Sequence, residues 1–580
     1  MNKESILNYI YRFFDIIVLA FIVFEFGYGY DEHYNSPHIS ALLLLSCGLL
    51  AFNFFKYFND PIQSNKKVVL INIITLTIIL LLCGLIALNN FNFHADYTIQ
   101  KIKPVVKSGL IFYFLLRLMV FVRYIYDIYY NPAIVFVGSF LILTLIGGFL
   151  LMLPSATTNG ISFTNALFTA TSAVCVTGLT VIDTAVDFTT VGQTIIIVLI
   201  QLGGIGILTF TSFFAFFFRG SSSFKEGLNT RDFIASDGLK DVFRAALNVV
   251  IFTLGVEIVG ALFIYTSIVD NPIVENDLYF SIFHSISSFC NAGFSTLPSG
   301  FVHETISSNY YFQWIIMLMI VLGGLGHNIV FNFFQYLKNH FVSLFYKKTI
   351  HKKVRIITVN TKIVIYTTII LLVGGFVFLY VSEFSNTLFG HKTIFGKITA
   401  ASFYSVSPRT AGFNTVDYSL MTVPSLLFVI FLMWIGGSPA STAGGIKTST
   451  FALATLNIYA VAKGKSRIEL FGRRISAEST SRAFAILSIS LITIGISIMA
   501  ILIFEPKGTP VLTVVFECFS AYSTVGLSLN FTPTLTEPSK YVLIACMFIG
   551  RIGMLNLMVG LLRRLNHQFY EYPKENILIN

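Results

Sequence analysis

Four short strips of the sequence combine a glycine with small, apolar and hydroxyl-bearing residues, and such strips could bind a cation through neutral oxygens. The strips are Val176-Thr177-Gly178, Asn291-Ala292-Gly293, Thr410-Ala411-Gly412 and Thr524-Val525-Gly526. Their glycines follow one another at intervals of 115, 119 and 114 residues. A repeat of this period therefore organises the last three quarters of the chain.

The chemistry that fits these strips is coordination of a dehydrated monovalent cation. Main-chain carbonyl groups can replace the water shell of an ion when consecutive peptides point inward. Glycine supplies the φ values that this geometry needs, and the neighbouring hydroxyl groups add oxygens or hold the loop. The strips contain no acidic residue, which argues against Ca²⁺ and Mg²⁺. One such glycine would more simply be a turn or a helix-packing residue, but four in register favour a pore.

Each strip ends a short stretch of about a dozen apolar and hydroxyl residues that lies between two long hydrophobic spans. A helix this short cannot cross a bilayer. We predict that it enters the membrane, turns at the glycine and leaves on the same side, so that its unpaired backbone lines water or protein. The first spans begin near Ala133, Ala246, Lys362 and Arg482, and the second spans begin near Val191, Tyr311, Pro424 and Tyr541.

The composition indicates a polytopic membrane protein. The 580 residues are 55% hydrophobic and 11% charged, with a mean hydropathy of +0.78, whereas soluble proteins carry roughly 25% charged residues. The net charge of +10 is explained by basic linkers between the repeats. The positive-inside rule places these linkers in the cytoplasm and all four strips outside, so we expect no nucleic-acid partner. The six cysteines lack metal or redox spacing, and we expect free buried thiols.

The first 130 residues hold four further hydrophobic segments, near 11–29, 40–57, 68–88 and 108–128. Each is about long enough to span a bilayer. If all four span, both termini are cytoplasmic, although Lys101, Lys103 and Lys107 would then lie outside. Arg117 and Arg123 are too few to separate voltage sensing from anchoring at the lipid interface.

A second glycine-rich stretch, 436–445, interrupts the second span of the third repeat. Proline and four glycines within ten residues break a helix in mid-membrane. Lys447 and Thr448 follow, but the spacing of a phosphate-binding loop is not met. The other second spans carry glycine groups at the matching position, and close helix packing explains the first two. The candidate residues of the stretch are Gly436, Gly437, Ser438, Gly444 and Gly445.

The fourth repeat carries Arg551 among its matching glycines. A central membrane arginine costs at least about 2.5–3.5 kcal/mol on insertion scales. Two interpretations remain open: an anchor to a salt-bridge partner or to backbone carbonyls, and a positive charge that faces the pore below the strips. Glu517 in the fourth short helix and Arg409 beside the third strip are interpreted as scaffold.

From about residue 131 to 580, the chain resembles the Trk/Ktr/HKT superfamily of potassium transporters. The resemblance rests on residues 173–179, 291–294, 409–414 and 524–528. It implies an all-α polytopic membrane protein with four tandem helix, pore-loop, helix repeats in a pseudo-fourfold arrangement, preceded by about four extra transmembrane helices. Glycine in all four strips resembles the potassium-selective members. The stretch 436–445 resembles the family's intramembrane gate loop, and Arg551 resembles its basic residue at this site.

The resemblance implies potassium uptake across the bacterial cytoplasmic membrane, driven by the membrane potential, with K⁺ as the transported ion, no enzyme activity and no cofactor on this chain. It also implies a homodimer, a cytosolic nucleotide-binding regulatory subunit and contact with membrane lipid. Sodium conduction or K⁺/Na⁺ coupling is the alternative within the superfamily. We expect an amino-terminal extension at 1–130 and pore repeats at 131–235, 236–355, 356–475 and 476–580, with the gate loop in the third repeat and a cytoplasmic tail in the last.

Overall fold

The computed structural model describes residues 35–59, 63–89, 132–206, 239–269, 276–345, 357–465 and 467–553, together with residues 13, 27, 102, 105, 106 and 113. These residues are helical apart from loops and one small hairpin of β1 (Glu469–Leu470) and β2 (Arg473–Arg474). The protein is thus an all-α protein, as its apolar spans predict.

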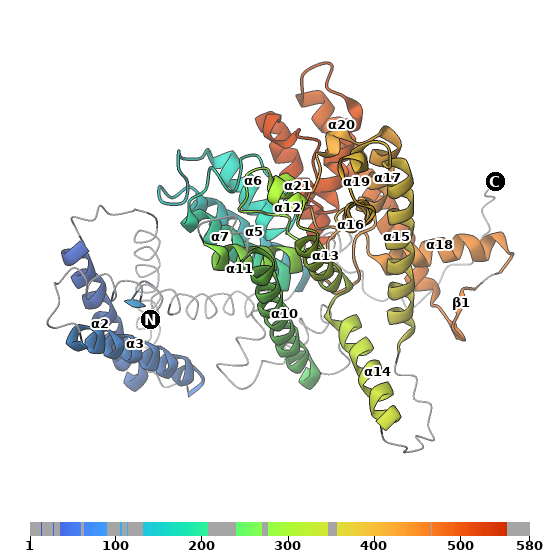
Figure 1. Cartoon of the computed structure of the whole chain (residues 1–580). Helices are drawn as coiled ribbons and strands as arrows, with labels where there is room; N and C mark the ends of the chain where they lie inside the picture. Colours follow the sequence, from blue (N-terminus) through green and yellow to red (C-terminus); the bar gives the residue numbers. More distant parts are fainter. Residues whose placement is uncertain are drawn as a thin grey trace, which may run out of the picture.

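From α5 onward, a long helix, a short helix and a second helix follow one another four times (Figure 1). The first repeat comprises α5 (Pro132–Leu151), α6 (Phe163–Val174) and α7 (Thr190–Ile205). The second comprises α10 (Leu239–Ile268), α11 (Asp277–Phe289) and α13 (Tyr310–Leu325). The third comprises α15 (Val359–Ser382), α16 (Ile394–Val406) and α17 (Val423–Trp434), and the fourth α19 (Ala477–Phe504), α20 (Val511–Tyr522) and α21 (Glu537–Ile552).

The short helices α6, α11, α16 and α20 have 12 or 13 residues each. At about 1.5 Å per residue they are too short for a hydrocarbon core of about 30 Å. Side chains at the N-caps fix three of their starts, since Ser162, Asn276 and Thr393 each accept a hydrogen bond from a backbone N–H in the first turn. Each short helix ends directly before a glycine strip.

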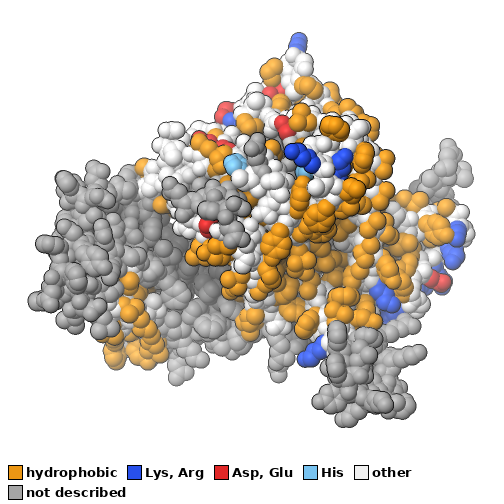
Figure 2. All heavy atoms as spheres, viewed as in Figure 1, with side chains coloured by type: hydrophobic (Ala, Val, Ile, Leu, Met, Phe, Trp, Pro, Cys, Tyr) orange, Lys and Arg blue, Asp and Glu red, His pale blue; other side chains and the backbone are white. Residues whose placement is uncertain are grey.

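Packing between repeats follows a closed order. The second helix of each repeat lies against the short helix of the next: α7 on α11, α13 on α16, α17 on α20 and α21 on α6. The first helices lie outside and leave apolar side chains exposed, such as Ile258 on α10, Val373 on α15 and Ile496 on α19. Hydrophobic side chains accordingly cover the middle of the face seen in Figure 2. Such a surface suits contact with lipid.

The second helices are shorter than the long spans that the sequence predicts. They have 16, 16, 12 and 16 residues, because α7, α13 and α21 stop at their glycine groups and α17 stops before stretch 436–445. The chain continues in α14 (His327–Phe345) and α18 (Thr448–Ala462). Within the described chain, three helices are long and apolar enough to cross a membrane, 247–268 of α10, α15 and α19, and α13 with the start of α14 makes a fourth if this pair, bent by 101°, is one span.

Two helices of the amino-terminal region are described, α2 (Asn35–Asn59) and α3 (Gln63–Asn89). They cover the predicted segments 40–57 and 68–88, pack on one another and lie apart from the repeats at the left of Figure 1. The predicted segments 11–29 and 108–128 lie outside the described residues, apart from 13, 27 and 113. All six cysteines are free, and five are buried as expected, but Cys47 on α2 is exposed.

Candidate functional site

The four strips share an unusual backbone. In each, the glycine has a positive φ, between 72° and 92°, and so does the residue two positions earlier, between 51° and 70°. Non-glycine residues rarely adopt positive φ, and β-branched ones least of all. The earlier residues are Val176, Asn291, Thr410 and Thr524. Because this costly conformation recurs at one position in all four strips, it is a built feature of the site.

The four glycines lie against one another in a closed cycle. A Cβ added to Gly178 would meet the Ala292 carbonyl oxygen and lie 3.1 Å from Cα of Gly293. A Cβ on Gly293 would lie 3.1 Å from Cα of Gly412, and one on Gly412 would lie 3.2 Å from Cα of Gly526. A Cβ on Gly526 returns to Gly178, at 3.0 Å from its Cα. Residues more than a hundred positions apart therefore form one ring, in which no side chain fits.

Serines in the short helices, or directly after one of them, hold the strips in place. The Ser172 hydroxyl accepts a hydrogen bond from the Gly178 N–H at 3.0 Å, and Ser520 accepts from the Gly526 N–H at 3.1 Å. In the other two strips, the serine donates instead to the carbonyl after the glycine; these serines are Ser287 and Ser407. The first and fourth strips thus share one mode of support, and the second and third share another.

Several hydroxyl groups beside the glycines are not used in hydrogen bonds within the described chain. The hydroxyl oxygens of Thr177, Ser523 and Thr524 are buried and have no hydrogen-bond partner within the described chain. The side-chain amide of Asn291 lies 3.3 Å from the Thr410 hydroxyl and links the second strip to the third. Among the residues described, no group of three or more His, Cys, Asp or Glu side chains could hold a metal ion. Oxygens of the neutral strips are therefore the candidate cation ligands.

Glu517 and His284 occupy matching positions, each nine residues before its glycine. His284 Nε2 lies 2.9 Å from the Ser295 hydroxyl, and Glu517 accepts hydrogen bonds from Ser528, at 3.1 Å, and Thr532. Both side chains therefore tie a short helix to the loop after its strip. These are the contacts that the scaffold interpretation of Glu517 predicts.

The glycine groups of the second helices have two structural roles. Gly203, Gly323 and Gly550 each lie against the carbonyl oxygen of the last residue of a short helix, so a Cβ there would overlap it. The close packing expected for the first two groups is present. Each group also ends its helix three residues later, at Gly206, Gly326 and Gly553, with φ of 80°, 76° and 83°. The sequence analysis missed these breaks, although a glycine with a free φ is the usual signal for a helix end.

Stretch 436–445, here called the gate loop after the role that the resemblance implies, folds back against the third and fourth strips, since Gly436 lies near Thr410 and Gly444 near Thr524. Ile435 pairs with Ile446 in a parallel bridge, and the Gly436 N–H donates to the Ile446 carbonyl at 2.8 Å. Its outer part contacts the second repeat, since the Thr442 hydroxyl donates to the carbonyl of Phe289 at 3.1 Å. Gly444 lies against the Thr524 side chain of the fourth strip. The loop thus reaches elements of three repeats.

Arg551 connects this loop to the first repeat. Its guanidinium donates to the Thr442 carbonyl and, at 2.7 Å, to the Gly203 carbonyl. These contacts are those of the first interpretation open from the sequence, an anchor to backbone carbonyls, and the segment that Arg551 anchors is stretch 436–445. Its guanidinium has no carboxylate partner within the described chain.

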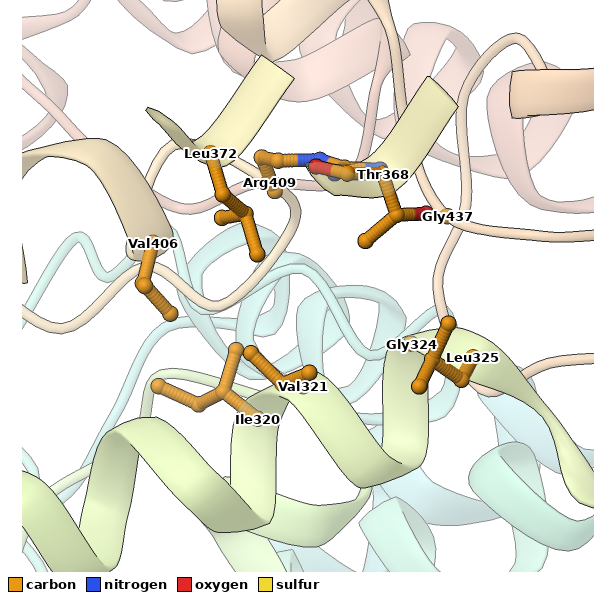
Figure 3. A pocket seen from close by; sticks show the side chains of 9 residues that line it. All are labelled: Ile320, Val321, Gly324, Leu325, Thr368, Leu372, Val406, Arg409 and Gly437. Carbon is orange, nitrogen blue, oxygen red and sulfur yellow. The ribbon is translucent and has the colours of Figure 1, made fainter. Parts of the chain in front are cut away.

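Arg409 also contacts the gate loop, which the sequence analysis did not predict. It donates to the carbonyls of Thr368, at 3.4 Å, and Gly436, at 3.1 Å. A small pocket lies beside it, between α13, α15 and the start of the loop, and Figure 3 shows Arg409 extending across its apolar lining. Arg409 therefore fixes the first residue of the loop to the third strip.

A buried polar cluster below the strips was also missed. Glu257 on α10 is 4% exposed and accepts a hydrogen bond from Gln201 of α7 at 2.9 Å. The Cys290 sulfur lies 3.7 Å from the Gln201 side chain. Single polar residues within apolar spans form no spacing pattern. The one sequence signal for Glu257 and Gln201 is that each is an isolated polar residue in an apolar span.

Comparisons with known proteins place this geometry in a family. The family described as TrkH, cation transport protein, matches residues 130–571. Potassium/sodium uptake protein NtpJ of Enterococcus hirae is 34% identical over 455 residues, which cover 77% of this chain and 97% of NtpJ. Ktr system potassium uptake protein B of Bacillus subtilis is 34% identical over 428 residues, which cover 74% of this chain and 92% of that protein.

The potassium transporter TrkH of Vibrio parahaemolyticus has a similar fold. Its crystal structure aligns with a TM-score of 0.60 at 17% identity and covers 86% of this chain and 99% of that one. The family match and the two relatives, together with this fold, confirm the resemblance to the Trk/Ktr/HKT superfamily. The protein is a multi-pass protein of the bacterial cell membrane and a transporter, not an enzyme. This chain belongs to the TrkH family of cation transport proteins.

Proposed function

We propose that this protein takes up potassium ions through a pore formed by the four glycine strips. The observation that carries the proposal is the closed cycle of contacts from Gly178 through Gly293 and Gly412 to Gly526. A pseudo-fourfold arrangement of repeats 131–235, 236–355, 356–475 and 476–580 accounts for this cycle and for the closed packing order of the helices. The names of the relatives, which describe potassium or potassium/sodium uptake, support the choice of ion.

In this proposal, the ion is held by the oxygens of residues 176–178, 291–293, 410–412 and 524–526. Carbonyl groups replace its water shell, and the unpartnered hydroxyls of Thr177 and Thr524 add oxygens at the ring. An inward monovalent cation gains about 2.3 kcal/mol per 100 mV of membrane potential. This gain suffices to concentrate potassium without an energy source on the chain.

The gate loop closes the pathway below the strips. Gly436, Gly437, Ser438, Gly444 and Gly445 give it its path, and Arg551 fixes it by donating to the Thr442 carbonyl. Removing Arg551 deletes two hydrogen bonds from a charged donor, worth about 1.5–3 kcal/mol each. We therefore expect Arg551→Ala to raise or deregulate ion flux at unchanged affinity. An unchanged rubidium uptake rate at normal membrane expression would count against this role.

We further propose a homodimer in the lipid bilayer and a cytosolic nucleotide-binding regulatory subunit. The word system in the names of the Ktr relatives supports a multi-subunit assembly. The basic linkers between the repeats supply charge on the cytoplasmic side for docking. Copurification of the chain with a soluble nucleotide-binding protein from its own cells would test this assignment.

The decisive experiment is expression in a bacterium that lacks its own potassium uptake. We expect growth at low potassium, and we expect Gly178→Ser to weaken the preference for potassium over sodium. No rescue by a chain that reaches the membrane, with a regulatory subunit coexpressed, would refute the proposal.

A second candidate function is coupled sodium and potassium uptake, which the name of the Enterococcus hirae relative favours. Rubidium uptake measured with and without external sodium separates the two functions.

A further inference from the structure

The linker between the third and fourth repeats forms a small hairpin with a defined turn. Its strands β1 and β2 pair antiparallel, with Glu469 opposite Arg474. The two residues between the strands, Phe471 and Gly472, both have positive φ, 50° and 75°, as a two-residue hairpin turn of the commonest type requires. An aromatic residue rarely adopts this conformation, so the surroundings of Phe471 hold it there.

The hairpin and the residues between it and α18 carry five cationic side chains and one carboxylate. All five cations are exposed, and none forms an ion pair within the described chain. Figure 2 shows cationic side chains at the right of the face, where Figure 1 places β1 and the end of α18. The five cations, here called the basic cluster, are Lys463, Lys465, Arg467, Arg473 and Arg474, and the carboxylate is that of Glu469.

The turn of the hairpin lies against α15, one of the helices that are long and apolar enough to cross a membrane. The Phe471 and Tyr366 rings stack with their centroids 6.0 Å apart, and Lys362 Nζ lies 5.0 Å from the centroid of the Phe471 ring. Tyr366 is about 10 Å from the start of α15, and the exposed apolar residues Ile369 and Ile370 follow within the next turn. Amphipathic aromatic rings gather at the level of the lipid headgroups. The hairpin is therefore held at the edge of the bilayer.

We propose that the basic cluster binds the phosphate groups of anionic phospholipids, and that Phe471 holds the hairpin at the level of those groups. A planar guanidinium can donate two parallel hydrogen bonds to one phosphate, and basic clusters directly beside a membrane span attract anionic lipids. Arg474 is three residues before α19, so a bound lipid stabilises the entry of this helix into the membrane. The inference goes beyond the proposed potassium uptake and needs only the location of the chain in a membrane.

The test is the melting temperature of the full-length protein in detergent during titration with one of two lipids. Dioleoylphosphatidylglycerol carries a net negative charge, whereas dioleoylphosphatidylcholine has the same acyl chains and no net charge. We expect the first lipid to raise the melting temperature at low salt and the second to change it little. The rise should shrink in 1 M salt, because the charges of exposed residues are then screened.

Three variants locate the binding site. Each basic residue near an anionic surface contributes about 5-fold to binding, so Arg473→Gln/Arg474→Gln should raise the phosphatidylglycerol concentration at half of the effect by at least about 10-fold. Both arginines are exposed, and their substitution leaves the core unchanged. Phe471→Asn creates the Asn-Gly pair that such turns favour and keeps both arginines, but it loses the aromatic contact with α15 and should also weaken binding. The matched control, Lys392→Gln/Lys507→Gln, removes the same charge from exposed positions before α16 and α20 and should respond like wild type.

An arginine double variant that responds to phosphatidylglycerol like wild type overturns the inference. So does a control variant that loses the response equally, because the effect then comes from net charge alone. A wild-type response of Phe471→Asn overturns the placement of the hairpin at the edge of the bilayer. If the arginine double variant keeps the lipid response but no longer binds a soluble nucleotide-binding protein, the cluster docks a protein instead. Transport is not measured here, so a failure of the proposed potassium uptake does not affect the result.

Discussion

A methyl group added at the glycine ring should affect transport far more than a methyl group added to an exposed turn with the same backbone. Gly178 and Gly160 have similar φ values, +89° and +77°. A Cβ on Gly160 would meet nothing within 4 Å, whereas one on Gly178 would meet the backbone of the second strip. The pair Gly178→Ala and Gly160→Ala therefore separates the cost of the backbone conformation from the effect of the ring.

The magnitudes follow from these contacts. An alanine forced into the left-handed region costs about 1–2 kcal/mol, and both variants incur this cost. Overpacking adds about 1–3 kcal/mol for Gly178→Ala, because the Ala292 carbonyl must move. That carbonyl belongs to the proposed ion pathway, and losing one ligand worth about 1.4 kcal/mol corresponds to 10-fold in affinity. We expect Gly178→Ala to raise the KM for rubidium at least about 10-fold and to weaken discrimination against sodium.

The assay is rubidium uptake over a range of concentrations in the uptake-deficient bacterium, with sodium as competitor, together with the melting temperature in detergent. Gly160→Ala should melt slightly lower and transport like wild type. If Gly178→Ala has the KM and selectivity of wild type while its melting temperature falls as that of Gly160→Ala does, the contact cycle has no role in ion binding.

Three further outcomes test the packing and the support of the ring. Gly375→Ala should lower the melting temperature, because its Cβ would overlap the Ser405 hydroxyl. The adjacent Gly374→Ala faces open space, so it should leave the melting temperature unchanged or raise it, with a gain in stability of up to about 1 kcal/mol. Ser172→Ala removes an acceptor from a strip N–H, and it should cost about 1 kcal/mol and reduce selectivity for potassium over sodium in competition uptake. Glu517→Gln keeps an acceptor for its two hydroxyl partners, so it should melt closer to wild type than Glu517→Ala, which removes that acceptor and leaves the two hydroxyls their bond to one another, at a cost of about 1–3 kcal/mol.

The period of the glycines predicted which residues meet. Gly178 and Gly526 lie at opposite ends of the repeats, yet the equal spacing assigned them to one ring, because equivalent positions of tandem repeats face a common axis. The positive φ of Val176 and Thr524 could not be predicted in this way. β-branched residues disfavour that region, and the surrounding structure imposes it against their local preference.

The sequence did not predict the breaks in the second helices, because glycine in an apolar span has two possible meanings. Glycine in an apolar span indicates close packing as readily as a helix end, and Gly323 and Gly326 show one of each, three residues apart. Hydropathy alone predicts a continuous span across both. Gly326, with its φ of 76°, permits the bend of 101° between α13 and α14, and the backbone N–H of Ser438 in the gate loop donates to the Gly324 carbonyl beside the bend at 2.9 Å.

Gly203 links the end of the first short helix to Arg551, the residue that binds the gate loop. Its Cα faces the carbonyl of Val174 at the end of α6, and its own carbonyl accepts from Arg551. The carboxyl end of a helix carries a partial negative charge of about half an elementary charge, which favours a cation below the strips. Arg551 is a cation that binds beside one of these helix ends, through the Gly203 carbonyl. The close packing of Gly203 on the end of α6 therefore also places a carbonyl where one arginine, from the fourth repeat alone, links the first repeat to the loop of the third.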